Sequence, residues 1–234
     1  MAQSAQPSPS RPGILVGLKA EARFIRQVFP HAAIAASGAC RAGALREAAR
    51  LAACGADCLL SFGLAAGLDP DLPAGSIIVP EKVSAWGSSY SADATLRHIL
   101  GAGQSGVLSG SLLHSDDVVL NADEKARLFA SSHCAALDME SGFLARAADE
   151  AGLPFAVLRV VCDPATRSLP SIAGTVLSPD GGLKVGALTK SLLRHPGQIP
   201  GLIALGRDGG MARSAMQTFL NHQRAQPAFA RLAA

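Results

Sequence analysis

Two acidic residues, Glu140 and Asp163, stand where two apolar segments end, "CAALDMESG" (134–142) and "PFAVLRVVCDPA" (154–165). Charge at these points adds nothing to a core, whereas the carboxyl ends of strands are where α/β sheets bind ligands. A pair of carboxyl groups there can do acid–base chemistry, one donating a proton and the other stabilising positive charge. Taken singly, however, Glu140 could be a helix-dipole contact and Asp163 a turn residue before proline.

Other polar residues also follow predicted strands. They are Glu21, the stretch 37–41, the glycine loop 63–67 and the stretch 114–117. The preceding strands are short apolar runs at 13–18, 32–37 and 57–62, with two more in a row within 76–85 and 105–115. Segments of helical period lie between most of them, at 19–29, up to about residue 54, and from the capping Asn121. This alternation predicts an α/β fold, a three-layer α/β/α sandwich around a mixed central sheet.

The chain length of 234 residues, 49% of them apolar, is enough for one substantial core. Residues 1–12 are rich in Ser, Pro and Gln and predict a disordered tail, so that 13–234 form a single domain. The C-terminal part predicts helices at 180–194, up to about Gly206, and from Gly210 to about His222.

Composition argues against several functions. The net charge of +3 is too small and dispersed for a nucleic-acid-binding surface. The five cysteines form no CxxC pair, which indicates free thiols and a cytoplasmic protein. No apolar stretch is long enough for a membrane span. "GACRAG" does not match the GxGxxG of dinucleotide-binding folds.

The linked motifs "LDMESG" and "PFAVLRVVCDPA" resemble the signature of the nucleoside phosphorylase and nucleosidase superfamily. The family's usual form is Glu-Met-Glu followed by a strand that ends in Ser-Asp. The likeness extends over about residues 13–165 through "GLKAEARF", "SGACRAGA" and "SFGLAAGLDPDLPAGSIIVPEKV". In addition, "HPGQIPGLIALGRDGGMARSAMQ" resembles the subgroup of phosphorylase-like proteins associated with hopanoid biosynthesis.

The resemblance implies roles in breaking the N-glycosidic bond of a purine nucleoside. Glu140 would bind the ribose hydroxyls and stabilise the cation-like sugar, and Asp163 would be the general acid toward purine N7. Glu21 would orient a water nucleophile or a ribose hydroxyl. The residues that would contact substrate are Met139, Asp138, Val118, Val119, Leu64, Ala65 and Ala66.

Phosphate is predicted to be the nucleophile, because Gly38 and Arg41 precede a helix and would form a phosphate site. We therefore expect inorganic phosphate as co-substrate, with no metal or other cofactor. Four positions depart from the family pattern: Leu64 replaces a serine, Ser61 an arginine of some phosphorylases, Asp138 a glutamate and Cys162 a serine. The changes at Leu64 and Ser61 remove familiar phosphate ligands, and Cys162 would donate a weaker hydrogen bond to Asp163 than a serine does.

The sequence thus predicts phosphorolysis of an adenosyl compound with an apolar 5′ group, which releases adenine in hopanoid biosynthesis. A homo-oligomer is expected from the resemblance, and peripheral contact with membrane lipid is considered. The alternative is a nucleosidase that hydrolyses methylthioadenosine or adenosylhomocysteine.

Two further classes stay open. One is a metal-dependent hydrolase built on "HSDD", with His114, Asp116 and Asp117. The other is a non-catalytic nucleoside-binding protein, against which the presence of both Glu140 and Asp163 argues.

Overall fold

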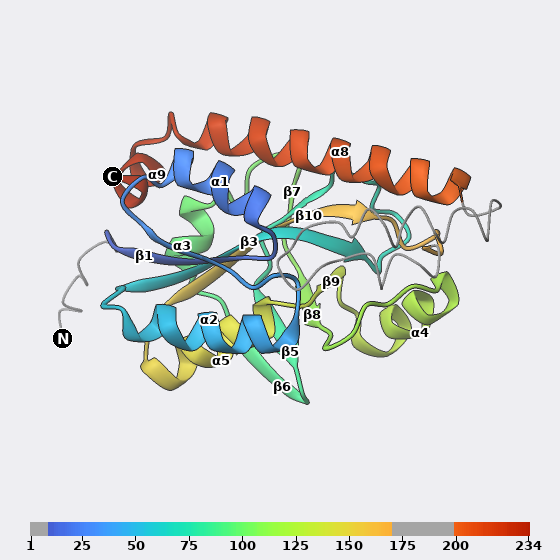
Figure 1. The fold of residues 1–234 in the computed structure, drawn as a ribbon, viewed down its shortest axis with the longest axis horizontal. Coiled ribbons are helices and arrows are strands. Elements are labelled where there is room, and N and C mark those ends of the chain that lie inside the picture. Colours follow the sequence, from blue (N-terminus) through green and yellow to red (C-terminus); the bar gives the residue numbers. More distant parts are fainter. Residues whose placement is uncertain (1–8, 170–198) are drawn as a thin grey trace.

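A computed structural model of the chain describes residues 9–169 and 199–234. A central sheet lies between two layers of helices (Figure 1). The strands are β1 (Pro12–Val16), β2 (Ala33–Ala36), β3 (Cys58–Gly67), β4 (Ile77–Ile78), β5 (Lys82–Ala85), β6 (Ser88–Ser91), β7 (Val107–Leu108), β8 (Ser111–His114), β9 (Ala136–Asp138) and β10 (Phe155–Asp163). The helices are α1 (Lys19–Val28), α2 (Arg41–Ala53), α3 (Ala94–Ile99), α4 (Ala122–Ser132), α5 (Ser141–Ala151), α8 (Ile199–Gln223) and α9 (Pro227–Ala233).

The sheet is mixed, as predicted. Strands β2, β1, β3 and β10 are parallel neighbours, whereas β9 runs antiparallel to the end of β3 and β4 antiparallel to β10. The remaining strands extend the two edges in the order β6-β5-β8-β9 and β4-β7. Because β3 pairs with β10 up to Ala66 and Asp163, and with β9 at Leu137, the ends of these three strands meet.

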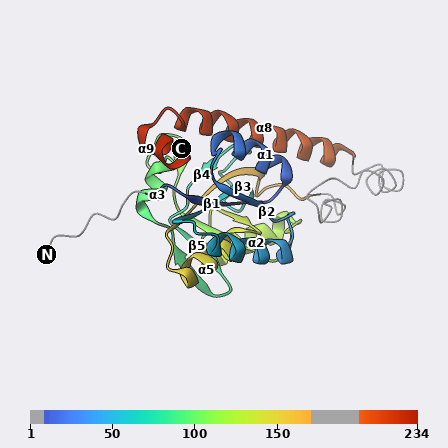
Figure 2. The same cartoon turned by 60° about the vertical axis from the view of Figure 1, so that its left-hand side comes forward.

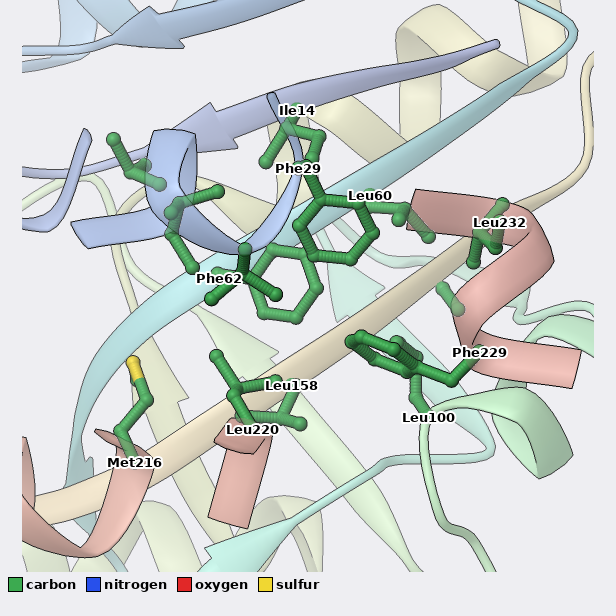
Figure 3. Packing of buried hydrophobic residues seen from close by; sticks show 14 of the residues in the cluster. Ile14, Phe29, Leu60, Phe62, Leu100, Leu158, Met216, Leu220, Phe229 and Leu232 are labelled. Atoms are coloured by element: carbon green, nitrogen blue, oxygen red, sulfur yellow. The ribbon is translucent and has the colours of Figure 1, made fainter. Parts of the chain in front are cut away.

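Each face of the sheet carries its own core, because successive side chains of a strand point to opposite faces. Helices α1, α3, α8 and α9 cover one face, and α2 and α5 cover the other (Figures 1 and 2). Figure 3 shows Met216 and Leu220 of α8 and Phe229 of α9 packed beside Phe62 and Leu158 of the sheet. The other core is built on small side chains of α2 and α5 such as Ala44, Ala48 and Ala148, which let these helices approach the sheet closely.

Two predictions of local structure are wrong. In the glycine-rich loop predicted at 63–75, residues 63–67 are instead the end of β3, since 63–66 pair with β10 and 66–67 pair with β9. Here the sheet hydrogen bonds outweigh the low strand propensity of Gly and Ala. Likewise α8 continues through Gly206 and Gly210, because Ala212, Met216 and Leu220 hold it against the sheet.

Residues 9–12 of the predicted tail are placed against the domain. Pro12 belongs to β1, and the backbone N–H groups of Ser10 and Arg11 donate to the Asp57 carboxylate. Residues 1–8 and the predicted helix at 180–194 lie outside the described residues. Within the described parts of the chain, no helix is both long and apolar enough to cross a membrane.

Candidate active site

A cavity of about 240 Å³ opens where the ends of β1, β3, β9 and β10 meet. Its lining is Gly17, Leu18, Glu21, Ala39, Gly63, Leu64, Ala65, Ala66, Val118, Val119, Leu137, Asp138, Met139, Glu140, Cys162, Asp163, Leu169 and Leu205. It therefore contains every residue predicted to be catalytic and every residue predicted to contact substrate. The two predicted phosphate ligands, Gly38 and Arg41, are not in this lining.

Glu21 reaches the cavity because α1 begins directly after β1. Its Oε2 accepts a hydrogen bond of 2.8 Å from the backbone N–H of Leu18, which caps the first turn of the helix. Gly17 leaves room for two carboxylates, since a Cβ there would lie 3.3 Å from an oxygen of Glu21 and an oxygen of Glu140. Burial raises the pKa of Glu21, and the hydrogen bond from Leu18 opposes that rise.

The turn from β2 into α2 supports Glu140. Gly38 and Ala39 have positive φ, and a Cβ on Gly43 would lie only 1.8 Å from the carbonyl oxygen of Ser37. This tight turn places the Ser37 hydroxyl so that it donates to Glu140 Oε1 at 3.1 Å. Arg41, in contrast, has a side chain that is 65% exposed and lies 3.3 Å from Asp116.

A fully buried arginine, Arg159 of β10, lies behind the carboxylates. Its Nε donates to Asp138 Oδ2 at 2.6 Å, and its Nη2 donates to the hydroxyl of Ser61 at 2.7 Å. Asp138 also accepts from the hydroxyl and the N–H of Ser141. The Asp138 carboxylate is thus engaged by protein groups, and it fixes Arg159 beneath the cavity. The sequence carries one signal for Arg159, because it is a charged residue inside an apolar strand.

Three carboxylates and one cation determine the electrostatic potential at this side of the cavity, and negative charge is in excess. Arg159 is 3.8 Å from Glu140 Oε2, and the carboxylates of Glu21 and Asp138 are close as well. Burial, and then the charge of Asp138, raise the pKa of Glu140 to about 7, while Arg159 opposes the rise. Glu140 therefore changes its charge near neutral pH.

Asp163 lies at the end of β10 and pairs with a lysine that sequence reasoning missed. The ammonium of Lys125, on α4, donates to Asp163 Oδ2 at 2.6 Å, and the Lys125 side chain is 0% exposed. Oδ1 of Asp163 is buried and has no hydrogen-bond partner among the described residues. Burial raises the pKa of Asp163, and Lys125 opposes that rise. Lys125 escaped notice because it stands in a polar helical segment, "NADEKARLFA", where a lysine is normally exposed.

The thiol of Cys162, where the family usually has a serine, also lines the cavity. Burial raises its pKa to about 12, and the charge of Asp163 contributes. Cys162 is therefore a neutral thiol at physiological pH and not a nucleophile.

Apolar side chains form much of the cavity. The predicted Leu64, Val118 and Val119 are joined by Leu169 and, from α8, by Leu205, which the sequence did not single out. Leu205 belongs to "IPGLIALG", an apolar stretch within the C-terminal segment. The remote helix α8 thus reaches the same cavity as the motifs of β9 and β10.

The "HSDD" residues are not part of the cavity lining, although β8 places His114 beside Asp138 of β9. His114 Nε2 is 3.3 Å from Asp116 Oδ1, and Asp116 also contacts Arg41 and Trp86. Across residues 9–169 and 199–234, no group of three or more His, Cys, Asp or Glu side chains is placed to hold a metal ion.

An α/β/α sandwich with paired carboxylates at the ends of its strands is the arrangement that the motifs implied. The sequence profile of the phosphorylase superfamily matches residues 37–175, and the chain belongs to that superfamily. The predictions of this family and of an enzyme of the nucleoside phosphorylase and nucleosidase class are thereby confirmed. No curated protein sequence matches the chain.

Solved structures similar to this chain are nucleosidases for 5′-methylthioadenosine and S-adenosylhomocysteine. The enzyme from Neisseria meningitidis, in complex with methylthio-immucillin-A, is 16% identical with a TM-score of 0.66, over 92% of this chain and 99% of that one. The enzyme from Helicobacter pylori, with butyl-thio-DADMe-immucillin-A, is 14% identical with a TM-score of 0.62, over 92% and 100%. The enzyme from Streptococcus pneumoniae is 15% identical with a TM-score of 0.61, over 90% and 98%. These similarities confirm the predicted fold class.

Proposed function

We propose that this protein is a nucleosidase that hydrolyses the N-glycosidic bond of an adenosine-type nucleoside with an apolar 5′ group. The observation that carries the proposal is the distribution of charge in the cavity. Four carboxyl groups, those of Glu21, Asp138, Glu140 and Asp163, line it, and its described lining contains no basic side chain.

Asp163 is suited to act on the leaving base. Its Oδ2 accepts from Lys125, whereas Oδ1 has no hydrogen-bond partner in the described parts of the chain and would carry the proton that is donated to a purine nitrogen. The partly apolar surroundings that raise the pKa of Asp163 make the protonated carboxyl group accessible. Protonation matters because an anionic purine is a poor leaving group, whereas a neutral one departs easily.

Glu140 is suited to stabilise the sugar. As the C1′–N bond breaks, the ribose gains positive charge, and an ionised carboxylate beside it binds that transition state better than the neutral substrate. Because its pKa is about 7, Glu140 is ionised above neutral pH. We therefore expect kcat/KM to rise as pH increases through about 7.

Water fits this cavity better than the phosphate that the sequence predicts. A phosphate dianion would lie beside Glu21 and Glu140, whereas Arg159 behind them is already paired with Asp138. Arg41 pairs with Asp116 instead of lining the cavity. Phosphorolysis is supported by one feature, Ala39 at the start of α2, where a helix N-terminus could bind an anion. On balance Glu21, a buried carboxylate with raised pKa, would orient and deprotonate a water molecule.

The proposal of an apolar 5′ group is based on Leu169 and Leu205, together with the predicted Val118 and Val119, all of which line the cavity. A buried methylene contributes about 0.8 kcal/mol, so a few methylenes in contact would raise selectivity by orders of magnitude. The solved neighbours are named for 5′-methylthioadenosine and S-adenosylhomocysteine, and the 5′ group of the first is small and apolar. The likeness of the C-terminal segment to the hopanoid-associated subgroup supports a larger group, an adenosyl lipid.

Product analysis tests the proposal. The protein is incubated with adenosine, with 5′-alkylthioadenosines of increasing chain length, and with a detergent-solubilised adenosyl lipid, each with and without phosphate. We expect free adenine and free sugar at the same rate in both buffers, with kcat/KM increasing with the 5′ chain. Adenine release that requires phosphate would establish phosphorolysis instead. A preference for plain adenosine would refute the apolar 5′ site, and binding without any base release would indicate a nucleoside-binding protein.

The cytoplasmic location, the homo-oligomer and the contact with membrane lipid stay predictions.

A further inference from the structure

Lys125 is an unusual residue for its position. It lies on α4 with its side chain fully buried, although a buried ammonium is costly unless it is completely hydrogen-bonded. All three of its N–H donors have acceptors: Asp163 Oδ2 at 2.6 Å, the carbonyl of Pro164 at 3.1 Å and the carbonyl of Arg167 at 2.9 Å. All three acceptors lie on one segment, from the end of β10 into the loop that follows it.

This contact fixes the orientation of the Asp163 carboxyl group. With Oδ2 held by Lys125, the group cannot rotate without breaking an ion pair, and Oδ1 is the oxygen left without a partner among the described residues. Asp163 lines the cavity, and Oδ1 is the carboxyl oxygen that a ligand there would engage without displacing Lys125.

The same helix secures the rest of the loop. The N–H of Leu169 donates to the carbonyl of Leu120 at 2.7 Å, and the N–H of Ala122 donates to the Ser168 hydroxyl at 3.0 Å. Because Leu169 lines the cavity too, the start of α4 holds both the carboxyl group and an apolar wall in place.

We propose that Lys125 is a positioning residue for Asp163, which holds Oδ1 toward the leaving base. The inference rests on the proposed function, because it assigns a partner to the general acid of that reaction. Lys125 itself does not line the cavity, so it acts through Asp163.

Lys125 is also the cation with the largest effect on the pKa of Asp163. The other titratable or charged groups near Asp163 are Arg167 of the loop, Asp208 of α8, the neighbouring Cys162, and Glu21 and Glu140 in the lining of the same cavity. Arg167 and Asp208 form an ion pair with each other, so their effects on Asp163 are opposed. Burial raises the pKa of Asp163, and Lys125 is the strongest influence that lowers it. Removing the ammonium should therefore raise that pKa.

The experiment compares Lys125→Met, which removes the charge, with Lys125→Arg, which keeps it. Arg127→Met is the matched control, because Arg127 lies two residues away on α4 and is exposed. Two quantities are measured for each protein: the pH profiles of kcat and KM for adenine release, and the pH titration of the ¹³C-labelled Asp163 carboxyl group by NMR, assigned with Asp163→Asn. Circular dichroism reports whether each variant folds.

In Lys125→Met we expect the Asp163 titration, and the limb of the kcat/KM profile that follows it, to move up by about one pH unit or more. The kcat should fall about tenfold or more while KM changes little, because orientation of the acid acts on the transition state. Lys125→Arg should keep the titration near that of the wild type but still lower kcat, since a planar guanidinium cannot place the same three donors. Arg127→Met should behave as the wild type.

Two results would overturn the inference. The first is a lowered kcat in Lys125→Met with an unchanged Asp163 titration, which would show that the role of the lysine is only structural. The second is a wild-type kcat in Lys125→Arg. The second result decides the matter even where Lys125→Met does not fold. If no nucleoside is cleaved by the wild type, the proposed function fails, and the NMR titration still decides whether Lys125 controls Asp163.

Discussion

Replacing Glu140 by Gln should stabilise the protein while it abolishes most of its activity. Glu140 is buried beside Asp138, and its pKa is raised from 4.5 to about 7. A group that titrates higher in the folded than in the unfolded chain binds a proton more tightly when folded. The folded state is therefore favoured while Glu140 is protonated, and that stability is lost as pH rises from about 4.5 through about 7.

The size of the effect follows from this difference. One pKa unit corresponds to about 1.4 kcal/mol, so ionised Glu140 costs the folded state about 3 kcal/mol at pH 8. The glutamine side chain of the variant would be neutral at all pH values and would escape this cost. Its amide can still accept from Ser37, but its NH₂ group would face Arg159, which reduces the gain. We expect the free energy of unfolding to increase by about 1–3 kcal/mol at about pH 8 and to change little at about pH 5.

Urea unfolding of the wild type and of Glu140→Gln at about pH 5, 6.5 and 8 measures this difference. Glu47→Gln is the control, because the pKa of Glu47 is lowered by Arg50, so neutralising Glu47 should not stabilise the protein. A stability difference for Glu140→Gln that does not vary with pH would refute the argument. In the same samples, kcat for adenine release should fall by roughly 10² or more, because the cationic transition state loses its counter-charge. An unchanged kcat would remove Glu140 from the active site.

Three further predictions concern the acid, the buried arginine and the apolar wall. Asp163→Asn should keep the fold and nucleoside binding, by circular dichroism and calorimetry, but lower kcat by roughly 10²–10⁴, and wild-type turnover would disprove its role as the acid. Arg159→Met should lower the free energy of unfolding by about 3–5 kcal/mol, and by more at pH 8 than at pH 5, because it leaves neighbouring buried carboxylates without a cation; an equally stable variant in urea unfolding would contradict this. Leu205→Ser should raise KM about tenfold for a long 5′-alkylthioadenosine and less for the methyl compound. Ile203 is 67% exposed, so Ile203→Ser should leave both KM values unchanged. Equal effects of the two variants would place the 5′ group elsewhere.

Much of the fold was available from the sequence, because it depends on local pattern. Apolar runs of strand length between segments of helical period determine an α/β sandwich, and consecutive strands without a helix determine a mixed sheet. The positions of Glu21 and Asp163 after strand ends also placed them at one edge, since the parallel strands β1 and β10 bring their carboxyl ends together. These inferences require only neighbours along the chain.

The tertiary structure decided what depends on contacts between distant segments. Residues 63–67 read as a loop because Gly and Ala have low strand propensity, but pairing with β9 and β10 makes them a strand. The predicted phosphate ligand Arg41 instead pairs with Asp116, which lies far from it in sequence.

The cations that pair with the active-site carboxylates also depend on contacts between distant segments. Lys125 and Arg159 look like an ordinary surface lysine and an isolated charge in a strand, and no local pattern says which carboxylate each of them meets. Burial makes those pairings decisive, because in a low-dielectric interior the nearest charge sets the protonation state of a carboxyl group. The sequence by itself therefore identified the carboxyl groups that reach the cavity, and only the three-dimensional packing decided how they are charged.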